Sequence, residues 1–378
     1  MSGRDIGSCA RIFGGEEMVI TNEQIHTMVM QFECEMKEFI ENAKASCVCY
    51  GNSLMIHGAL EELSEDGFNV RYIVDDTPEK QGRVVDGIEV VSRLDERIRS
   101  EKYIIGTNSS VKRMRENFEW GGVKPLLFMP FCKYSLWKHF DECIYVRDNF
   151  LEDEKSVEIY NLAMYAQMTD YHNIDSTGYG EANQYFAIPE FDLLVHEHFV
   201  DAGAFVGDTL DEFIRHSQSF EKYVCFEPDE KHIRAIEARK KRLCAEWNLP
   251  DDAIEIVRAG VGECSSKADL SSDYTGSSTR VVYDELGDGG IDVVKLDDYL
   301  AGQKVTFIKA DIEGMEMQAL KGARELIKKQ KPKMAICVYH LPWDIYKIPL
   351  LVKELNCEYK FKMRLHSKGY EELVLYCY

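Results

Sequence analysis

The sequence predicts an α/β protein in which strands and helices alternate around mostly parallel sheets. Three observations support this fold class. Short apolar runs with strand character recur between helical segments through most of the chain. One of these strands leads into a glycine-rich turn that opens a helix, from Asp201 to Thr209. The next ends at the acidic residue Glu227, a combination typical of nucleotide-binding sheets.

We expect two α/β units with helical segments around them, because the 378-residue chain exceeds one domain of typical size. The predicted units are an N-terminal extension with a helix (1–45), a small Rossmann-like α/β domain (46–150), a helical linker (151–184) and a larger α/β domain (185–378). In the extension, Thr21 and Gln24 form a capping box ahead of apolar residues at helical spacing. This pattern predicts an amphipathic helix that ends near Lys44.

Apolar runs bounded by turn residues give the strands of each unit. In the first unit they predict strands at 46–50, 70–74, 88–91 and 103–106, followed by a helix from about Val111. The linker is helical over 154–168. In the second unit they predict strands at 199–201, 223–227, 254–258, 305–311, 334–339, 357–365 and 373–378.

The charge of the chain limits its partners. Aspartate and glutamate number 66 against 45 lysines and arginines, a formal net charge of -21. This field repels nucleic acid and offers no polybasic membrane anchor, so we expect neither nucleic acid nor a membrane as a partner. The sequence shows neither a signal peptide nor an apolar run of about 18 residues, and we expect a cytoplasmic protein.

The twelve cysteines are scattered and include no Cys-x-x-Cys pair. Free buried thiols of this kind are typical of a reducing compartment. Zinc sites need a characteristic ligand spacing, which is missing here, so the sequence predicts no metal site.

The segment from Asp201 to Thr209 combines a strand end, two glycines and a helix start. Gly203 and Gly207 let the backbone turn sharply and let a ligand approach it closely. The unpaired N–H groups of the following helix can hold a carboxylate such as that of methionine. We expect Asp201, at the carboxyl end of the strand, to receive a ligand ammonium. The alternative is a tight strand-to-helix turn without a ligand.

Glu227 ends the next apolar strand, and Pro228 stops that strand. An acid at this distance from a glycine turn hydrogen-bonds both ribose hydroxyls in nucleotide-binding sheets, because a carboxylate accepts two bonds from a vicinal diol. The alternative is a solvated residue at a strand end. The turn reads Asp-x-Gly-x-x-x-Gly and places Asp201 near a cofactor ammonium, which favours S-adenosylmethionine (SAM) over a dinucleotide.

Lys309, Asp311 and Glu313 alternate at the end of a third apolar strand. If the chain stays extended, the three side chains lie on one face. Buried charges are costly unless they are paired or used. We therefore expect Asp311 and Glu313 to line the cleft and to orient an acceptor hydroxyl or accept its proton. The alternative is a structural Lys–Asp salt bridge.

His340 ends a fourth apolar strand, beside Tyr339. Its ordinary pKa near neutrality suits a general base, and the alternative is a structural histidine at a strand end. Trp343, Asp344 and Tyr346 follow, and we expect them to wall a substrate pocket.

Several ordered motifs resemble the FkbM family of SAM-dependent methyltransferases. They are Val200-Asp-Ala-Gly-Ala-Phe-Val-Gly-Asp-Thr209, Phe226-Glu-Pro-Asp229, Gly276-Ser-Ser-Thr279, Ile308-Lys-Ala-Asp-Ile-Glu-Gly-Met-Glu316, Lys331-Pro-Lys-Met-Ala-Ile-Cys-Val-Tyr-His340, and the closing Arg364-Leu-His366 with Glu372-Leu-Val-Leu-Tyr376. The resemblance covers about residues 185–378. It departs from the family pattern where Thr279 replaces a serine and where Leu365 separates an arginine from a histidine.

The resemblance implies a class I methyltransferase fold, with a Rossmann-like seven-stranded sheet and SAM across the carboxyl ends of its strands. It implies that the following residues bind the cofactor: Asp201, Gly203, Ala204, Gly207, Thr209, Glu227, Pro228, Asp229 and Asp311, together with Gly260 and Val261 of the segment Ala259-Gly260-Val261, which is similar to the family segment that flanks the adenine. It also places Asp311 and Glu313 near the reacting methyl group.

The predicted function is SAM-dependent O-methylation of a hydroxyl on a sugar or natural-product-like small molecule, with His340, Asp311 and Glu313 as candidate catalytic residues. The alternatives are an NAD-dependent oxidoreductase and a non-catalytic SAM-binding protein. The N-terminal unit resembles small Rossmann-like domains, but Ser53 stands where a dinucleotide-binding turn usually has glycine. We therefore expect this unit to hold substrate or to build a homo-oligomer.

Overall fold

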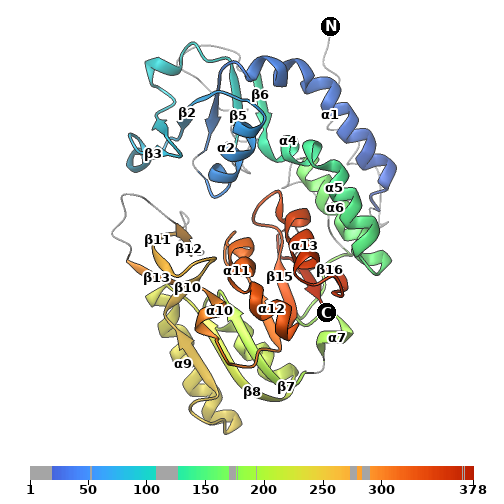
Figure 1. The fold of residues 1–378 in the computed structure, drawn as a ribbon, viewed down its shortest axis with the longest axis vertical. Coiled ribbons are helices and arrows are strands. Elements are labelled where there is room, and N and C mark those ends of the chain that lie inside the picture. Colours follow the sequence, from blue (N-terminus) through green and yellow to red (C-terminus); the bar gives the residue numbers. More distant parts are fainter. Residues whose placement is uncertain are drawn as a thin grey trace.

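The computed structural model describes residues 19–51, 53–107, 127–169, 176, 178–192, 194–272, 279–282, 290–367, 369 and 371–378. The helix expected from about Val111 and the matched residues 276–278 lie outside these ranges. Figure 1 shows an N-terminal α/β unit at one end of the molecule and a larger C-terminal unit at the other. None of the described helices is long and apolar enough to cross a membrane.

The N-terminal unit contains a six-stranded sheet in the order β3-β4-β2-β1-β5-β6. Its strands are β1 (Cys47–Tyr50), β2 (Val70–Val74), β3 (Val84–Val85), β4 (Ile88–Val91), β5 (Tyr103–Gly106) and β6 (Leu127–Pro130), and helix α2 (Ile56–Glu65) follows β1. All neighbouring strands are parallel except the β3–β4 hairpin. The predicted strands are β1, β2, β4 and β5, whereas β3 and β6 were not predicted.

Four further helices lie beside the two sheets (Figure 1). They are α1 (Asn22–Ala43), α4 (Phe131–Lys138), α5 (Phe140–Phe150) and α6 (Glu154–Met168). The predicted capping box begins α1, since the Thr21 side chain accepts the N–H of Gln24 and the Gln24 side chain accepts the N–H of Thr21. The apolar stripe of α1 is buried against α4 and α6, so these helices partner it within the same chain.

The C-terminal unit is built on a seven-stranded sheet in the order β16-β17-β15-β14-β7-β8-β9. Its strands are β7 (Leu194–Ala202), β8 (Ser217–Phe226), β9 (Ile254–Val257), β14 (Phe307–Ala310), β15 (Lys333–Cys337), β16 (Phe361–Leu365) and β17 (Leu373–Cys377). Renumbered within this sheet and read from β9, the order is 3-2-1-4-5-7-6, with the last strand antiparallel to both neighbours. The expected class I methyltransferase fold is therefore confirmed.

Helices and a second, smaller sheet complete this unit. The helices are α7 (Pro189–Asp192), α8 (Asp208–His216), α9 (Glu230–Trp247), α10 (Leu296–Tyr299), α11 (Glu316–Gly322), α12 (Arg324–Gln330) and α13 (Asp344–Leu355). The smaller sheet, in the order β10-β13-β11-β12, was not predicted; it contains β10 (Ala259–Val261), β11 (Ser266–Ser272), β12 (Thr279–Val282) and β13 (Ile291–Val294).

A cluster of aromatic rings holds the central strands of the large sheet together. Phe199 of β7 stacks on Tyr223 of β8 at a centroid distance of 5.0 Å and contacts Phe307 of β14 at 4.6 Å. Phe213 of α8 packs on Phe199 at 4.6 Å, and all four side chains are buried. Because buried aromatic side chains dominate core energetics, this cluster fixes the strand ends that carry the predicted site.

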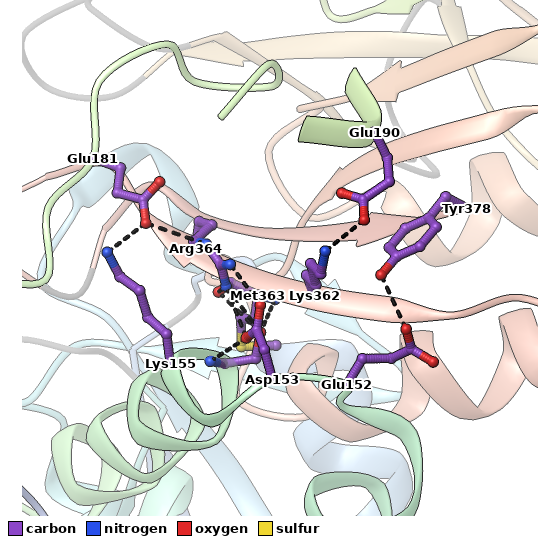
Figure 2. Close-up of polar contacts among 10 residues, drawn as sticks. Glu152, Asp153, Lys155, Glu181, Glu190, Lys362, Met363, Arg364 and Tyr378 are labelled. Carbon is purple, nitrogen blue, oxygen red and sulfur yellow. Dashed lines mark hydrogen bonds and ion pairs between the residues drawn. The ribbon is translucent and has the colours of Figure 1, made fainter. Parts of the chain in front are cut away.

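Arg364 ties the edge of the large sheet to helix α6 (Figure 2). Its guanidinium donates to both carboxylate oxygens of Asp153, at 3.2 and 2.7 Å, and its Nε lies 3.2 Å from Glu181. His366 lies 2.9 Å from the Tyr376 hydroxyl and 2.9 Å from the Glu181 carbonyl oxygen. The closing Arg-Leu-His segment therefore anchors the helical part of the chain to the sheet.

Candidate active site

The carboxyl ends of β7 and β14 lie side by side where the strand order of the large sheet reverses. Ligands of open α/β sheets bind in the crevice at such a point. Ala202 and Ala310 pair as the last residues of the two strands. The segments that follow, loop 203–207 and loop 311–315, contain many of the predicted site residues.

Gly203 allows these two loops to touch. It has φ +82°, and a Cβ built on it would lie 1.9 Å from the Asp311 carbonyl oxygen. Gly207 has φ +79° and is the N-cap residue of α8, where a Cβ would meet only ordinary contacts. The path of the backbone therefore explains both glycines, whether or not a ligand is bound.

Asp201 is buried beneath loop 203–207 and is paired within the protein. Lys309 Nζ lies 3.0 Å from its Oδ1, and the Tyr223 hydroxyl donates to its Oδ2 at 2.5 Å. Burial alone would lower the pKa of Lys309, but Asp201 and Asp311 raise it above its ordinary value, so the lysine stays charged. The ammonium at Asp201 thus belongs to Lys309, and the expectation of a ligand ammonium there was wrong because that place is taken.

Glu227 follows β8 and joins loop 203–207 to the start of α9. Its Oε2 accepts the N–H of Phe205 at 2.9 Å, and its Oε1 accepts the N–H of Asp229 at 2.9 Å. His232 Nδ1 lies 3.4 Å from Oε1, and the Glu227 side chain is 7% exposed. A carboxylate has about four lone-pair sites, so Glu227 retains the capacity to accept bonds from a diol.

Pro228 and Asp229 shape the start of α9 beside Glu227. Asp229 is the N-cap residue, and its carboxylate accepts the N–H of Lys231 at 2.7 Å. Capping satisfies one of the free N–H groups of the first turn. The side chain of Asp229 is therefore used by the helix, while its backbone N–H orients Glu227.

The remaining residues expected at the cofactor site are buried. Ala204 lies in loop 203–207, and Thr209 lies in the first turn of α8. Gly260 and Val261 lie in β10, where they pair with β13. These four positions contribute backbone and small side chains around the strand ends.

Asp311 opens the loop after β14. The Tyr185 hydroxyl donates to its Oδ2 at 2.7 Å. Burial would raise the pKa of Asp311, but Lys309 and His340 outweigh this effect and hold the pKa below its ordinary value. Asp311 is therefore an oriented, ionised carboxylate at the carboxyl end of β14, where the strand order of the sheet reverses.

Glu313 does not share a strand face with Lys309 and Asp311. Strand β14 ends at Ala310, and Glu313 has φ +56°, so the chain leaves the extended path within the loop. The expectation of three charges along one face was wrong for this reason. Glu313 still lies near Asp311, because both approach the same histidine.

His340 lies among three carboxylates. Its Nδ1 is 3.0 Å from Glu316 Oε1, and its Nε2 is 3.5 Å from Asp311 Oδ1 and 3.7 Å from Glu313 Oε2. Burial would lower the pKa of His340, but these neighbours, Glu316 foremost, raise it to about 10. An imidazole with this pKa is already protonated at neutral pH, which argues against the expected role of general base.

Two residues of this region were not predicted. Tyr185 reaches Asp311 from a segment more than a hundred positions earlier, and no local pattern signals such a contact. Glu316 begins α11 and is the last residue of the motif Ile308–Glu316, which assigns it no role. A carboxylate in the first turn of a helix was the available signal, but this signal usually indicates interaction with the helix dipole.

The N-terminal unit covers the edge of the C-terminal unit that carries this site. A Cβ built on Gly314 would lie 2.4 Å from Leu54, so Leu54 packs directly on loop 311–315. A Cβ on Gly58 would lie 2.3 Å from the Trp343 indole, which also meets Phe131 edge-on at a centroid distance of 6.1 Å. The candidate site is thus bordered by both units.

Trp343, Asp344 and Tyr346 do not wall a pocket, contrary to expectation. All three are buried. The Trp343 indole is covered by the N-terminal unit, and the Tyr346 ring stacks on His139 at a centroid distance of 5.0 Å. The two aromatic rings therefore serve the contact with residues that precede the C-terminal unit, whereas the Asp344 carboxylate accepts the N–H of Leu341.

Comparisons with known proteins agree with this architecture. The family profile described as Methyltransferase FkbM domain matches residues 201–363. The structure of methyltransferase FkbM from Methylobacillus flagellatus KT is similar, with a TM-score of 0.56 and 20% identity over 94% of this chain and 99% of that chain.

Weaker similarities extend over about half of the chain. An rRNA methylase from Streptococcus thermophilus has a TM-score of 0.29 and 13% identity over 49% of this chain and 86% of its own. A Streptococcus mutans protein solved in complex with SAH has a TM-score of 0.29 and 14% identity over 49% of this chain and 88% of its own. The comparison with curated proteins finds no match. By its strand order and its profile match, the segment 201–363 is thus similar to the methyltransferase domain of the FkbM family.

Proposed function

We propose that the protein is a SAM-dependent O-methyltransferase whose acceptor is a hydroxyl of a small, carbohydrate-like molecule. The observation that carries the proposal is the hydrogen bond from the Phe205 N–H to Glu227. It joins the glycine loop and the acidic strand end at the topological switch point, where such sheets hold nucleotides.

The residues around Glu227 fit the cofactor. Glu227 is buried at a strand end, and its carboxylate has lone pairs left for the two ribose hydroxyls. The free N–H groups at the start of α8, which Gly207 caps without a side chain, suit the carboxylate of the methionine part. When bound, SAM supplies a methyl group on a positively charged sulfur. Asp201 is proposed to contribute indirectly, because it holds the Lys309 ammonium beneath loop 203–207.

Asp311 and Glu313 are the carboxylates proposed to handle the acceptor. Both approach His340, and their side chains are 22% and 35% exposed, so they are open to a ligand. The acceptor oxygen forms a bond to the methyl carbon while the carbon–sulfur bond breaks and its electron pair leaves with sulfur. The hydroxyl proton passes to a carboxylate, which contributes about 10²–10⁴-fold to the rate.

Three observations favour a small polyhydroxyl acceptor. The carboxylates at the strand ends accept hydrogen bonds from hydroxyl groups. Leu54 packs on loop 311–315, so the N-terminal unit borders the site and limits the space for a large acceptor. The net charge of -21 disfavours nucleic acid. A small carbohydrate meets all three conditions, and the N-terminal unit is proposed to help hold it.

Calorimetric titration with SAM tests the cofactor proposal. Glu227→Gln should weaken SAM binding by about 10- to 100-fold, because it removes charge-assisted bonds to the ribose. Glu221→Gln is the matched control, since Glu221 lies exposed on β8, the strand that Glu227 follows, and pairs with His196. Unchanged SAM affinity in folded Glu227→Gln would defeat the proposal.

A thermal-shift assay separates the proposal from an NAD-dependent activity. A ligand that binds only the folded state raises the unfolding midpoint. We expect a rise with SAM and none with NAD. A rise with NAD alone would favour an oxidoreductase.

A further inference from the structure

Three side chains from different segments converge beyond the carboxyl ends of β14 and β15. Asp311 follows β14, Glu316 opens α11 and His340 lies shortly after β15. Each offers one ligand atom, and the three atoms lie within 4.8 Å of one another. An imidazole with two carboxylates is a donor set that divalent metal ions use in proteins.

Buried polar atoms of this cluster lack hydrogen-bond partners within the part of the chain that the structure describes. The His340 side chain is 6% exposed, yet neither ring nitrogen makes a hydrogen bond of good geometry, although Nδ1 is at ion-pair distance from Glu316. Glu316 is fully buried; its Oε1 accepts the N–H of Ile312 at 2.8 Å, and its Oε2 has no hydrogen-bond partner. A buried polar group without a partner lowers stability, so a ligand at the cluster would remove that cost.

The cluster also gathers negative charge. Glu313 Oε2 lies 3.7 Å from His340 Nε2, and the buried Asp344 uses one oxygen to accept the N–H of Leu341. The buried ammonium of Lys309 is held by Asp201 and the Gly203 carbonyl oxygen. Closely spaced buried carboxylates need compensating positive charge; without an ion, a protonated His340 supplies one unit, whereas a divalent cation supplies two at one point.

We propose that Asp311, Glu316 and His340 bind a divalent transition-metal ion, such as Mn²⁺ or Zn²⁺. The imidazole favours an ion of this class over Mg²⁺ or Ca²⁺, which prefer oxygen ligands alone. A proton on His340 leaves when the ion binds, since a ligand imidazole must be neutral.

The role of the ion rests on the proposed function, whereas its binding does not. The ion would lie next to the proposed acceptor site, where it would polarise the acceptor hydroxyl as a Lewis acid. Asp311 is then a metal ligand, and Glu313, the more exposed carboxylate, takes the proton. The predicted absence of a metal site followed from cysteine spacing, which says nothing about carboxylate and histidine ligands.

Titration of the EDTA-treated full-length protein with MnCl₂ tests the site, with free Mn²⁺ measured by electron paramagnetic resonance. We expect one Mn²⁺ per chain, and a Kd at least about 10-fold higher in Glu316→Gln and in His340→Gln, because even the loss of a group that only orients a metal ligand costs about 10- to 100-fold in affinity. Glu354→Gln is the control, because it removes the same charge from an exposed position on α13. Zn²⁺ is tested in parallel by its competition with Mn²⁺.

The outcomes are separable. Absence of binding to the unaltered protein up to about 1 mM of either ion overturns the proposal, because ΔG° is then weaker than about -4 kcal/mol. Binding that is unchanged in both cluster variants overturns it as well, since the ion then lies elsewhere. If circular dichroism shows that neither variant folds, the Mn²⁺ affinity of Asp311→Asn is measured instead, because the Asp311 side chain is partly exposed; an unchanged affinity then overturns the proposal. SAM titration of the same samples reports on the proposed function independently, and Glu227→Gln should keep its metal affinity.

Discussion

Lys309 and Asp201 form a buried ion pair, 3.0 Å apart, between neighbouring strands directly beneath the glycine loop. The same ammonium donates to the Gly203 carbonyl oxygen at 2.5 Å. The pair therefore sets the direction of the backbone at the first turn of the loop. Asp201 acts as a positioning residue, through Lys309, on the segment proposed to hold the cofactor.

Replacing Lys309 by methionine should destabilise the protein by about 3–5 kcal/mol, because Asp201 would remain buried without its counter-charge. Urea unfolding measures this change. The double variant Lys309→Met with Asp201→Asn should recover part of the loss, since it removes the uncompensated charge. A single variant as stable as the unaltered protein would show that the pair does not hold the loop.

Gly203→Ala should cost about 2–5 kcal/mol. Left-handed backbone strain accounts for about 1–2 kcal/mol, and the overlap of the new Cβ with the Asp311 carbonyl oxygen adds about 1–3 kcal/mol. Gly302→Ala is the control, because Gly302 has φ +76° but no heavy atom within 4 Å of the added Cβ. Equal losses in the two variants, measured by urea unfolding, would mean that the close approach of the two loops is not tight.

Asp153 should make the stability of the protein depend on pH in the acid range. Burial would raise its pKa, but Arg364 and Ser156 lower it to about 2. A carboxyl whose pKa is lowered by folding stabilises the protein above its unfolded pKa of about 3.9, and this contribution is lost as the pH falls through about 2.

Asp153→Asn should therefore lose about 1–2 kcal/mol at neutral pH, a value reduced by solvent screening because the side chain is 31% exposed. The difference from the unaltered protein should shrink between about pH 4 and pH 2. Asparagine is an equally good N-cap, so the substitution isolates the charge. Urea unfolding across this pH range measures the loss of stability, with Asp251→Asn, at an exposed position, as control. A loss in Asp153→Asn that stays constant down to pH 2.5 would contradict the lowered pKa of Asp153.

Glu313→Gln should lower kcat by about 10²–10⁴-fold and leave SAM affinity unchanged, because this side chain is proposed to take the hydroxyl proton. Formation of S-adenosylhomocysteine with a panel of sugars gives the rate. Glu263→Gln, an exposed acid that pairs with Lys321, serves as control. An unaltered kcat in the Glu313 variant would remove it from the chemistry.

Local patterns predicted much of the C-terminal unit. A strand, a glycine turn and an acidic strand end lie close in sequence, and the structure joins the glycine loop to Glu227 through the N–H of Phe205. The same holds for the helix that begins at the capping box of Thr21 and Gln24. Each of these features depends on residues within one strand–helix unit or one helical turn.

Contacts between distant segments escaped prediction. The partner of Lys309 could be chosen only when β14 was known to lie beside β7, which the order along the chain does not reveal. Aromatic residues occur both in ligand pockets and in buried contacts between segments, so the sequence does not decide which of the two Trp343 serves. The contact of its indole with Gly58, distant in sequence, shows that it is a buried contact. The approach of Asp311 and Glu316 to His340 depends on the turn at Glu313, which has a positive φ. Sequence patterns do not predict a positive φ in a non-glycine residue.

A crystal structure of the protein with S-adenosylhomocysteine tests the central claim most directly. The account predicts both ribose hydroxyls within hydrogen-bond distance of the Glu227 carboxylate, and the amino-acid part of the ligand against loop 203–207. A ligand bound elsewhere, with the Glu227 carboxylate still held by the N–H groups of Phe205 and Asp229 and not by ribose, would contradict it.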